Sequence, residues 1–333
     1  MRRPGPALRR AWPDSRSPSR AHHALRVLLV AAALWMLAGC APRPKGARLV
    51  LLGDIMLGRG VAQAYDGDNW EHALEALVPF TALADLTAAN LESPLTSRPR
   101  AVPAGFDLRA PPESVRALSR SGVTLVSLAN NHILDGGQPG LAQTLDVLQE
   151  AGIAAIGPAG EALVRQAGGV PLAFLAFDDV SRALDVDEAA SAVSRAREQG
   201  RMVVVSIHWG REYLSVPDDR QEALARALAD AGASVIWGHH PHVVQSVRWV
   251  QGGALPYPTL VAYSLGNLLF DQAGPPGTRR GVALGLALGS DGAHSVQAYA
   301  FVIDPSRLAL RSADPAARLA LEQRLGPAVS VVH

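Results

Sequence analysis

The sequence predicts an α/β fold for the first three-quarters of the chain and an antiparallel sheet for the last quarter. Short apolar runs typical of buried strands alternate with helical patterns from residue 48 to residue 237. Beyond residue 243, four apolar runs follow one another with almost no helix between them. With 333 residues, 48% of them hydrophobic and 18% charged, the chain is long enough for one large domain or two small ones.

Local signals define each expected element. Helices are marked by proline or an acid at the start and glycine at the end: the helix that opens at Pro111 is closed by Gly122, and Asn69 is expected to cap the first helix. The expected strands are 48–52, 88–91, 124–128, 153–156, 171–176, 202–207, 233–237, 243–250, 259–265, 281–288 and 295–303. The expected helices are 70–78, 111–121, 139–150, 187–199 and 217–231.

The N-terminal segment has the features of a lipoprotein signal peptide. An apolar run over residues 27–38, too short to be a permanent bilayer span, ends in Leu37-Ala38-Gly39-Cys40, which resembles a bacterial lipobox. Cys40 is the only cysteine, so lipidation would account for it; a plain signal peptide with a coincidental cysteine is the alternative. We expect a protein of the cell envelope, lipid-anchored outside the cytoplasm. The expected segments are a signal peptide over 1–39, a tether over 40–47, one domain over 48–305 and a C-terminal extension over 306–333.

The distribution of charge argues against one class of partner. Residues 1–39 hold seven arginines and one aspartate, so the formal net charge of +1 for the whole chain leaves the rest acidic. No basic stripe with interleaved aromatic residues occurs there, and we therefore do not expect nucleic acid as a partner.

Metal-binding residue types follow the expected buried strands. Because ligand sites in α/β sheets lie at the carboxyl ends of the strands, these residues are expected to converge. Each alone has a structural alternative: an aspartate caps a helix, an asparagine occupies a left-handed turn, and a histidine is a hydrogen-bonded core residue. Together they form an oxygen and nitrogen ligand set without thiolate, which suits one or two divalent Mn, Fe or Zn ions. The residues are Asp54, Glu92, Asn131 with His132, His208, and the pair His240 and His242.

Six motifs in order make the chain resemble a known family. They are Gly53-Asp54-Ile55-Met56-Leu57-Gly58-Arg59, Asn90-Leu91-Glu92, Ala129-Asn130-Asn131-His132, His208-Trp209-Gly210-Arg211-Glu212-Tyr213, Gly238 to Val243 with Gln245, and Ser264-Leu265-Gly266-Asn267 with Phe270-Asp271. Over residues 48–303 they resemble the CapA family, bacterial proteins linked to poly-γ-glutamate capsule synthesis and export. That family is similar to the calcineurin-like metallophosphoesterases, which implies a two-sheet sandwich flanked by helices, in α/β/β/α layers.

The resemblance also implies roles for individual residues. Glu92 stands where those enzymes place a carboxylate that bridges two metals. Asn131, His208 and His240 would complete one metal site, and Asp54 and His242 the other. His132 and Arg211 would be catalytic, His132 by protonating a leaving group or by holding a phosphoryl oxygen. Substrate-binding candidates are Arg59, Glu212, Gln245 and Asn267, for which hydrogen bonds to the metal-binding imidazoles are the alternative role.

One position departs from the metallophosphoesterase pattern. Those enzymes begin with D-x-H, but here Met56 stands two residues after Asp54. A thioether is a poor ligand for the ions that this set selects, so we expect the second metal position to be weakly occupied or empty. If strand alternation continues past Asp54, residue 56 lies on the same face, and Met56→His would restore that position.

Three functions remain open from the sequence. The first is a metal-dependent hydrolase or transferase acting on an anionic polymer or another envelope substrate, with capsule synthesis and export proteins as partners. The second is a non-catalytic lipoprotein that uses the same pocket to hold the polymer or an export partner. The third is a general metallophosphodiesterase.

Overall fold

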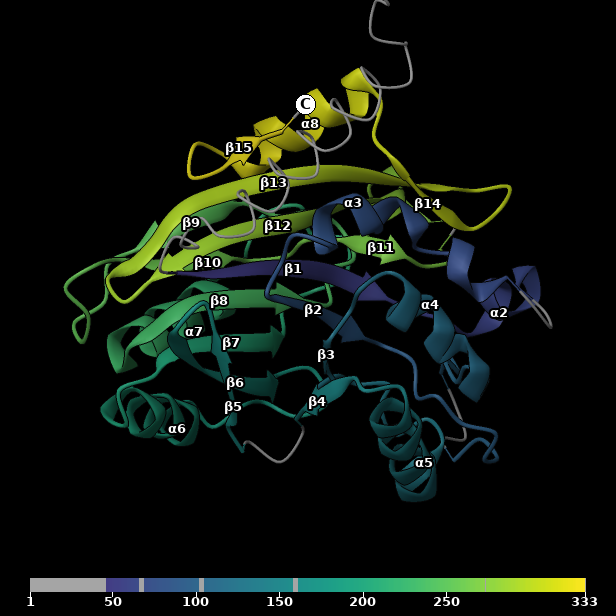
Figure 1. Cartoon of the computed structure of the whole chain (residues 1–333), viewed down its shortest axis with the longest axis horizontal. Coiled ribbons are helices and arrows are strands. Elements are labelled where there is room, and N and C mark those ends of the chain that lie inside the picture. The colour runs from purple at the N-terminus through teal and green to yellow at the C-terminus, as the bar shows by residue number, and fades with distance from the viewer. Residues whose placement is uncertain (1–45, 66–68, 102–104, 158–160, 273, 333) are drawn as a thin grey trace, which may run out of the picture. The chain divides into compact units, whose positions relative to one another are not determined.

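A computed structural model gives the structure of the chain (Figure 1), and it describes residues 46–332 apart from 66–68, 102–104, 158–160 and 273. The expected signal peptide, Cys40 and most of the tether lie outside the described residues. Among the described residues, no helix combines the length and apolar character needed to cross a membrane.

Nine strands of the described chain form the first sheet, whose main path runs in the order β14-β13-β12-β1-β2-β3-β4. Strands β1 to β4 are parallel, whereas β12, β13 and β14 join antiparallel on the other side of β1. Off this path, β11 pairs with β1, and β15 pairs with β13. The strands are β1 (Ala47–Ile55), β2 (Leu86–Leu91), β3 (Leu125–Ser127), β4 (Ala154–Ile156), β11 (Asn267–Leu269), β12 (Arg280–Gly289), β13 (Gly292–Asp304), β14 (Ala309–Ser312) and β15 (Ser330–Val331).

The second sheet of the described chain has six strands in the order β5-β6-β7-β8-β10-β9. Its four central strands are parallel, and each edge strand pairs antiparallel with its neighbour. The strands are β5 (Leu163–Ala167), β6 (Val170–Asp178), β7 (Met202–His208), β8 (Ala233–His239), β9 (Val247–Val250) and β10 (Thr259–Ala262). The short apolar runs of β7 and β8 are buried throughout, as expected of parallel strands that are covered on both faces.

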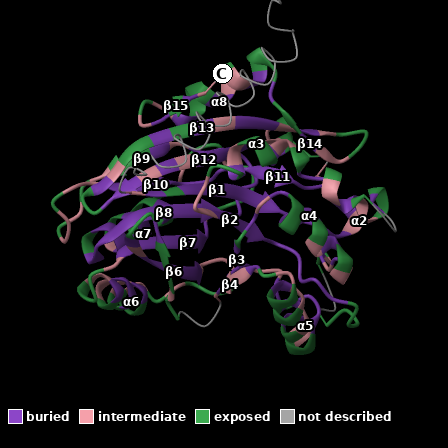
Figure 2. Ribbon diagram, viewed as in Figure 1, coloured by how far each residue is buried: buried purple, intermediate pink, exposed green. Residues whose placement is uncertain are grey.

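Three apolar cores separate the layers. The central core lies between the two sheets and contains Leu51, Phe174 and Trp237. A second core joins the first sheet to helices on its outer face, and a third joins the second sheet to α6 and α7. Buried strands between helices with exposed outer faces are visible in Figure 2. The layers are therefore α/β/β/α, as predicted. The α-helices are α2 (Arg59–Ala64), α3 (Val78–Thr81), α4 (Val115–Arg120), α5 (Gly137–Glu150), α6 (Val186–Glu198), α7 (Asp219–Ala231) and α8 (Pro315–Leu325).

The last quarter differs from the single antiparallel sheet that we expected. Strands β9 and β10 extend the second sheet, and β10 pairs parallel with β8. Strands β12 and β13 instead join the first sheet beside β1. The pattern of a strand identifies its buried faces but not its neighbour, so these runs gave no indication that they belong to two sheets. Within the expected C-terminal extension, β14 and β15 pair with β13, and α8 packs against the central core.

Helix boundaries follow the capping chemistry in some places and not in others. Asp218 and Gln221 form a reciprocal capping box at the start of α7, and Gly232 ends that helix at φ 103°. The expected single helix over 70–78 is wrong. Asn69 makes no capping bond, and the segment forms two short 3₁₀ turns instead. The short helix α3 then starts at Val78, with Pro79, which has no amide hydrogen, in its first turn. Four 3₁₀ turns complete the described elements: η1 (Trp70–His72), η2 (Glu75–Leu77), η3 (Pro112–Ser114) and η4 (Pro276–Arg279).

Candidate metal centre

The carboxyl ends of β1, β2, β7 and β8 meet at one edge of the two sheets. Asp54 lies opposite Asn90 in the pairing of β1 with β2, and His208 lies opposite His239 in the pairing of β7 with β8. Glu92 follows directly after β2, and the turn that begins with His240 follows β8. The parallel arrangement therefore brings together side chains that are far apart in the sequence.

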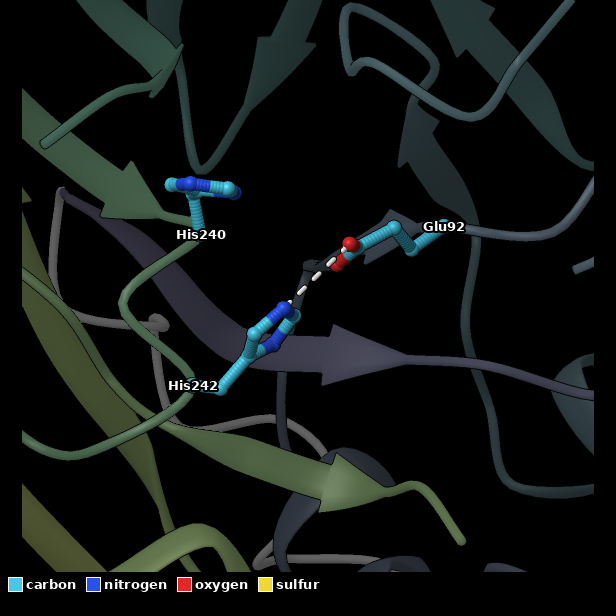
Figure 3. A group of neighbouring side chains, drawn as sticks. All are labelled: Glu92, His240 and His242. Carbon is cyan, nitrogen blue, oxygen red and sulfur yellow. Dashed lines mark ion pairs between the residues drawn. The ribbon is translucent and has the colours of Figure 1, made fainter. Parts of the chain in front are cut away.

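Glu92, His240 and His242 form the centre of this group (Figure 3). Each is buried, and each offers one ligand atom such that the three atoms lie within 4.8 Å of one another. His242 Nε2 lies 3.6 Å from Glu92 Oε1. Figure 3 shows Glu92 and His242 pointing toward one another, with the ring of His240 nearby. We call these three residues the Glu92 cluster.

The other predicted ligands surround the Glu92 cluster. His208 Nε2 lies 3.9 Å from Glu92 Oε1 and 2.9 Å from Asn131 Oδ1. Asp54 Oδ2 lies 3.4 Å from His242 Nδ1. All six predicted ligands therefore belong to one connected network of side chains.

His239 belongs to this network and was not predicted. Its Nδ1 lies 3.0 Å from Asp54 Oδ1, and its ring packs edge-on against Trp237 at 4.5 Å between centroids. The sequence interpretation ended the strand at Trp237, but β8 continues through His239. Alternation along the longer strand places residue 239 on the same face as Trp237, which is the signal that could have identified it.

Four buried polar atoms of this network have no hydrogen-bond partner among the described residues. They are Glu92 Oε1, His208 Nδ1, His239 Nε2 and His240 Nδ1. Buried polar atoms in folded proteins nearly always have a partner, and such a concentration at one point is therefore unusual. Imidazole nitrogens and a carboxylate oxygen are ligands for borderline divalent ions, so the residues fit a metal.

The two central carboxylates differ in their proton affinity. Burial is the largest influence on Glu92, and together with the charges of Asp54 and Glu212 it raises the pKa of Glu92 well above its usual value. Burial also acts to raise the pKa of Asp54, but hydrogen bonds from His239 and His242 hold that pKa well below its usual value. Asp54 is therefore the permanent anion of the centre, and Glu92 is the group that needs a nearby positive charge.

The three predicted histidine ligands also differ. Burial lowers the pKa of His208 well below its usual value, and burial with the charge of His242 lowers the pKa of His240 to about 4. Burial acts to lower the pKa of His242 as well, but the charge of Glu92 and the contact with Asp54 raise it to about 9. His208 and His240 therefore keep free lone pairs at neutral pH, whereas His242 carries a proton that a bound cation would replace.

Backbone strain is concentrated at the same place. Of six non-glycine residues with positive φ in the described chain, four lie here: Arg59 at 52°, Tyr213 at 66°, His240 at 92° and His242 at 56°. Residues in this region cost about 1–3 kcal/mol each and occur preferentially at functional sites. The packing of the surrounding sheets therefore stabilises a left-handed backbone conformation at residues of the candidate site that would otherwise be unfavourable.

Two glycines allow the sheets to approach closely beside the ligands. A Cβ at Gly53 would lie 2.0 Å from the carbonyl oxygen of Gly266. At Gly238 it would lie 2.2 Å from the carbonyl oxygen of Tyr263 and 2.4 Å from Trp209 Nε1. Neither residue has a left-handed backbone, so close packing and not backbone freedom requires glycine at both positions.

A small cavity of about 190 Å³ adjoins the Glu92 cluster on the side of His242. His242 lines it, and the predicted residues Arg59, His132 and Glu212 line it as well. His132 Nδ1 lies 3.1 Å from Asp135 Oδ2, so the carboxylate of Asp135 fixes the ring. Asp135 was not singled out from the sequence, although it lies only three residues beyond His132. The remaining lining residues are Phe106, Leu108, Tyr213, Phe270, Gln272 and Gly274.

Three predicted site residues have other positions or roles. Asn267 is fully buried, and its Oδ1 lies 3.0 Å from His242 Nδ1, so it orients that imidazole and does not line the cavity. The buried amide of Gln245 donates to the carbonyl oxygens of Leu214 and Val216 and thereby holds the loop after β7. Arg211 is exposed and does not line the cavity; the next two residues of its loop do.

The expected alternation past Asp54 is also wrong. The pairing of β1 with β11 shifts register between Asp54 and Ile55. Met56 packs in the apolar core of the first sheet, and its sulfur accepts a hydrogen bond of 3.0 Å from the backbone N–H of Gly58. The bulge reorients residue 56, so a histidine there would enter the apolar core.

Comparison with known proteins identifies a family and a fold. The sequence pattern of a family described as bacterial capsule synthesis protein PGA_cap matches residues 48–272. The capsule biosynthesis protein CapA of Bacillus anthracis is 32% identical over 252 residues, covering 67% of this chain and 60% of that protein. The PGA biosynthesis protein CapA of Bacillus subtilis strain 168 is 34% identical over 244 residues, covering 66% and 62% respectively. The chain thus spans about 60% of the length of these relatives.

The fold also has a match among solved structures. The crystal structure of a hypothetical protein from Thermus thermophilus superposes with a TM-score of 0.52 and 21% sequence identity. It covers 77% of this chain and 99% of the matched chain. This likeness supports the fold alone.

Proposed function

Because the chain belongs to the family of bacterial capsule synthesis proteins described by PGA_cap, we propose that it acts in the synthesis or export of poly-γ-glutamate or a related envelope polymer. Two of its relatives carry names that refer to capsule or PGA biosynthesis. We further propose that it does so through metal-dependent hydrolase-like chemistry on an amide or phosphoester bond. The observation that carries this proposal is the group of unpartnered buried ligand atoms beside the cavity.

The Glu92 cluster would hold the metal, with His208, Asn131 and Asp54 beside it. A divalent Mn, Fe or Zn ion bound there would supply Lewis acidity and lower the pKa of water. The protein's own groups have separate tasks. His132, fixed through Nδ1 by Asp135, would hold a proton at Nε2 for a leaving group. Arg59, rather than the exposed Arg211, would bind an anionic group in the cavity.

A non-catalytic role in holding the polymer or an export partner is the second candidate. The observation that favours it is Met56, which follows β1, packs in the apolar core and gives the centre no imidazole at this strand end. Without that ligand, a centre with two metals lacks one nitrogen donor of the metallophosphoesterase pattern. General phosphodiesterase activity, the third candidate, is tested by the same experiment.

The test measures metal content and activity on the same preparation. We expect purified protein reconstituted with Mn, Fe or Zn to shorten poly-γ-glutamate chains, with bis-p-nitrophenyl phosphate as the probe of phosphodiesterase activity. Glu92→Gln and His240→Ala should lose both metal and activity, whereas Glu222→Gln, a surface control paired with Arg248, should lose neither. Metal-loaded wild type that cleaves neither compound but binds the polymer would support the non-catalytic candidate.

We also propose that Cys40 is lipidated and anchors the domain to a membrane of the cell envelope. The lipobox-like sequence Leu37-Ala38-Gly39-Cys40 supports this proposal.

A further inference from the structure

The cavity beside the Glu92 cluster carries two side chains of opposite charge. Arg59, at the start of α2, and Glu212, in the loop after β7, both line it. Glu212 repels a ligand that carries negative charge only, because like charges brought together are unfavourable. The carboxylate therefore favours a ligand that carries a positive charge as well as a negative one.

Arg59 is held in a fixed orientation. Its Nη2 lies 2.9 Å from Asp271 Oδ1, and its guanidinium lies over the Phe106 ring at 5.2 Å from the centroid. Asp271 is itself fixed, because its Oδ2 accepts the backbone N–H of Gly60 at 2.8 Å. A guanidinium has five N–H donors, so the contact with Asp271 leaves others for a carboxylate in the cavity.

Glu212 has no cationic partner among the described residues. It accepts a hydrogen bond from the Tyr213 hydroxyl, and burial together with this bond raises the pKa of Tyr213 to about 12. Glu212 lines the same cavity as His242, so its carboxylate lies beside the metal centre. The carboxylate is thus free to receive an ammonium group of a ligand.

The size and walls of the cavity limit the ligand further. Its volume of about 190 Å³ is below the roughly 300–1,000 Å³ of pockets that enclose a drug-sized molecule. Phe106 and Tyr213, which are 66% and 41% exposed, flank the polar groups with aromatic surface. One amino-acid unit with a short methylene chain suits this space, whereas the interior of a long chain does not.

We propose that the cavity binds the free-amino end of a γ-linked glutamyl chain, with the α-carboxylate at Arg59 and the α-ammonium at Glu212. The identity of the chain rests on the proposed function, and the zwitterionic character of its end rests on the two charges in the cavity. Only the terminal residue of a γ-linked chain has an ammonium and a carboxylate on the same carbon. Internal residues have the carboxylate but an amide nitrogen in place of the ammonium.

Binding of short ligands to full-length protein tests this without relying on turnover. Isothermal titration calorimetry would compare three ligands. They are γ-glutamyl-glutamate, its N-acetyl derivative, and the derivative in which the α-carboxylate of the amino-terminal residue is an amide. We expect wild type to bind the free ligand at least about tenfold more tightly than either derivative, because each derivative removes one charged hydrogen bond. Equal affinity of wild type for the free and acetylated ligands, or no measurable binding of either, would overturn the proposal.

Matched variants assign the two charges. In Glu212→Gln the free and acetylated ligands should bind equally, while the preference for the free α-carboxylate persists. In Arg59→Gln the free and amidated ligands should bind equally, while the preference for the free ammonium persists. Glu222→Gln should keep both preferences. Loss of affinity for all ligands to the same degree in Glu212→Gln would contradict the assignment. Cleavage of a polymer whose amino ends are fully acetylated would contradict this inference and leave the proposed function intact.

Discussion

Proton competition at His242 gives the sharpest prediction for the metal centre. The raised pKa of His242, about 9, means that this imidazole is about 99% protonated at pH 7. A metal must displace that proton before it can bind the Nε2 that faces Glu92. Because the protonated form is lost as pH rises toward 9, the apparent metal affinity should increase with pH. Between pH 6 and pH 8 the increase should be at least about tenfold per unit, because the raised pKa of Glu92 gives the centre a second proton that a bound cation displaces.

The other imidazoles do not add to this slope. Burial keeps the pKa values of His208 and His240 below the usual range, so both are already neutral at pH 6. Apparent Zn affinity would be measured by competition with a chelating dye at pH 6, 7 and 8. Proton release would be counted by calorimetry in two buffers of different ionisation enthalpy. An affinity that stays constant from pH 6 to pH 8, or release of no proton, would refute the reasoning.

Two variants separate this effect from general pH sensitivity. Asn267→Leu removes the hydrogen bond that helps to raise the pKa of His242, so the pH at which the affinity levels off should move down. His294→Gln changes a surface histidine paired with Asp291 and should leave the curve unchanged. The same dependence of metal affinity on pH in wild type and Asn267→Leu would show that a group other than His242 controls metal binding.

Four further predictions follow from single residues. Cys40→Ser should release the protein from membranes, and a variant that still pellets with them would contradict lipid anchoring. His208→Ala should reduce metal content by elemental analysis far more than Asn267→Leu, since loss of a group that only orients a ligand costs about 10–100-fold in affinity; equal losses would argue against His208 as a ligand. Gln245→Leu should increase hydrogen exchange in the loop after β7 without changing metal content, because it removes the hydrogen bonds to the carbonyl oxygens of Leu214 and Val216; unchanged exchange would exclude that role. Met56→His should lower the melting temperature and reduce the free energy of unfolding by about 1–3 kcal/mol, because it buries a polar ring in the apolar core. It should not add a second metal, and a gain of metal would instead support the alternation expected from the sequence.

The sequence predicts which side chains converge at the candidate site, because their positions at the ends of strands depend on local patterns. Asp54, Glu92 and His208 each follow or end an apolar run, and parallel pairing brings such ends to one edge without further information. His239 was missed because its strand is two residues longer than its apolar run. Gln245 was recognised as part of a motif, but its partners are backbone carbonyls about 30 residues away, and no local pattern reveals these. Likewise, no local pattern reveals that β10 joins β8 while β12 joins β1.

The close contacts at Gly53 and Gly238 affect how a mutational scan of this protein should be interpreted. Neither residue has a side chain to offer a metal, yet any larger residue at either position would collide with backbone atoms beside Asp54 or His239. The collision cannot be relieved by rotating a flexible side chain, because the nearest atom at each position is a backbone carbonyl oxygen. Both positions should therefore be as intolerant of substitution as the ligands themselves. Intolerance alone will not distinguish a residue that binds from one that makes room.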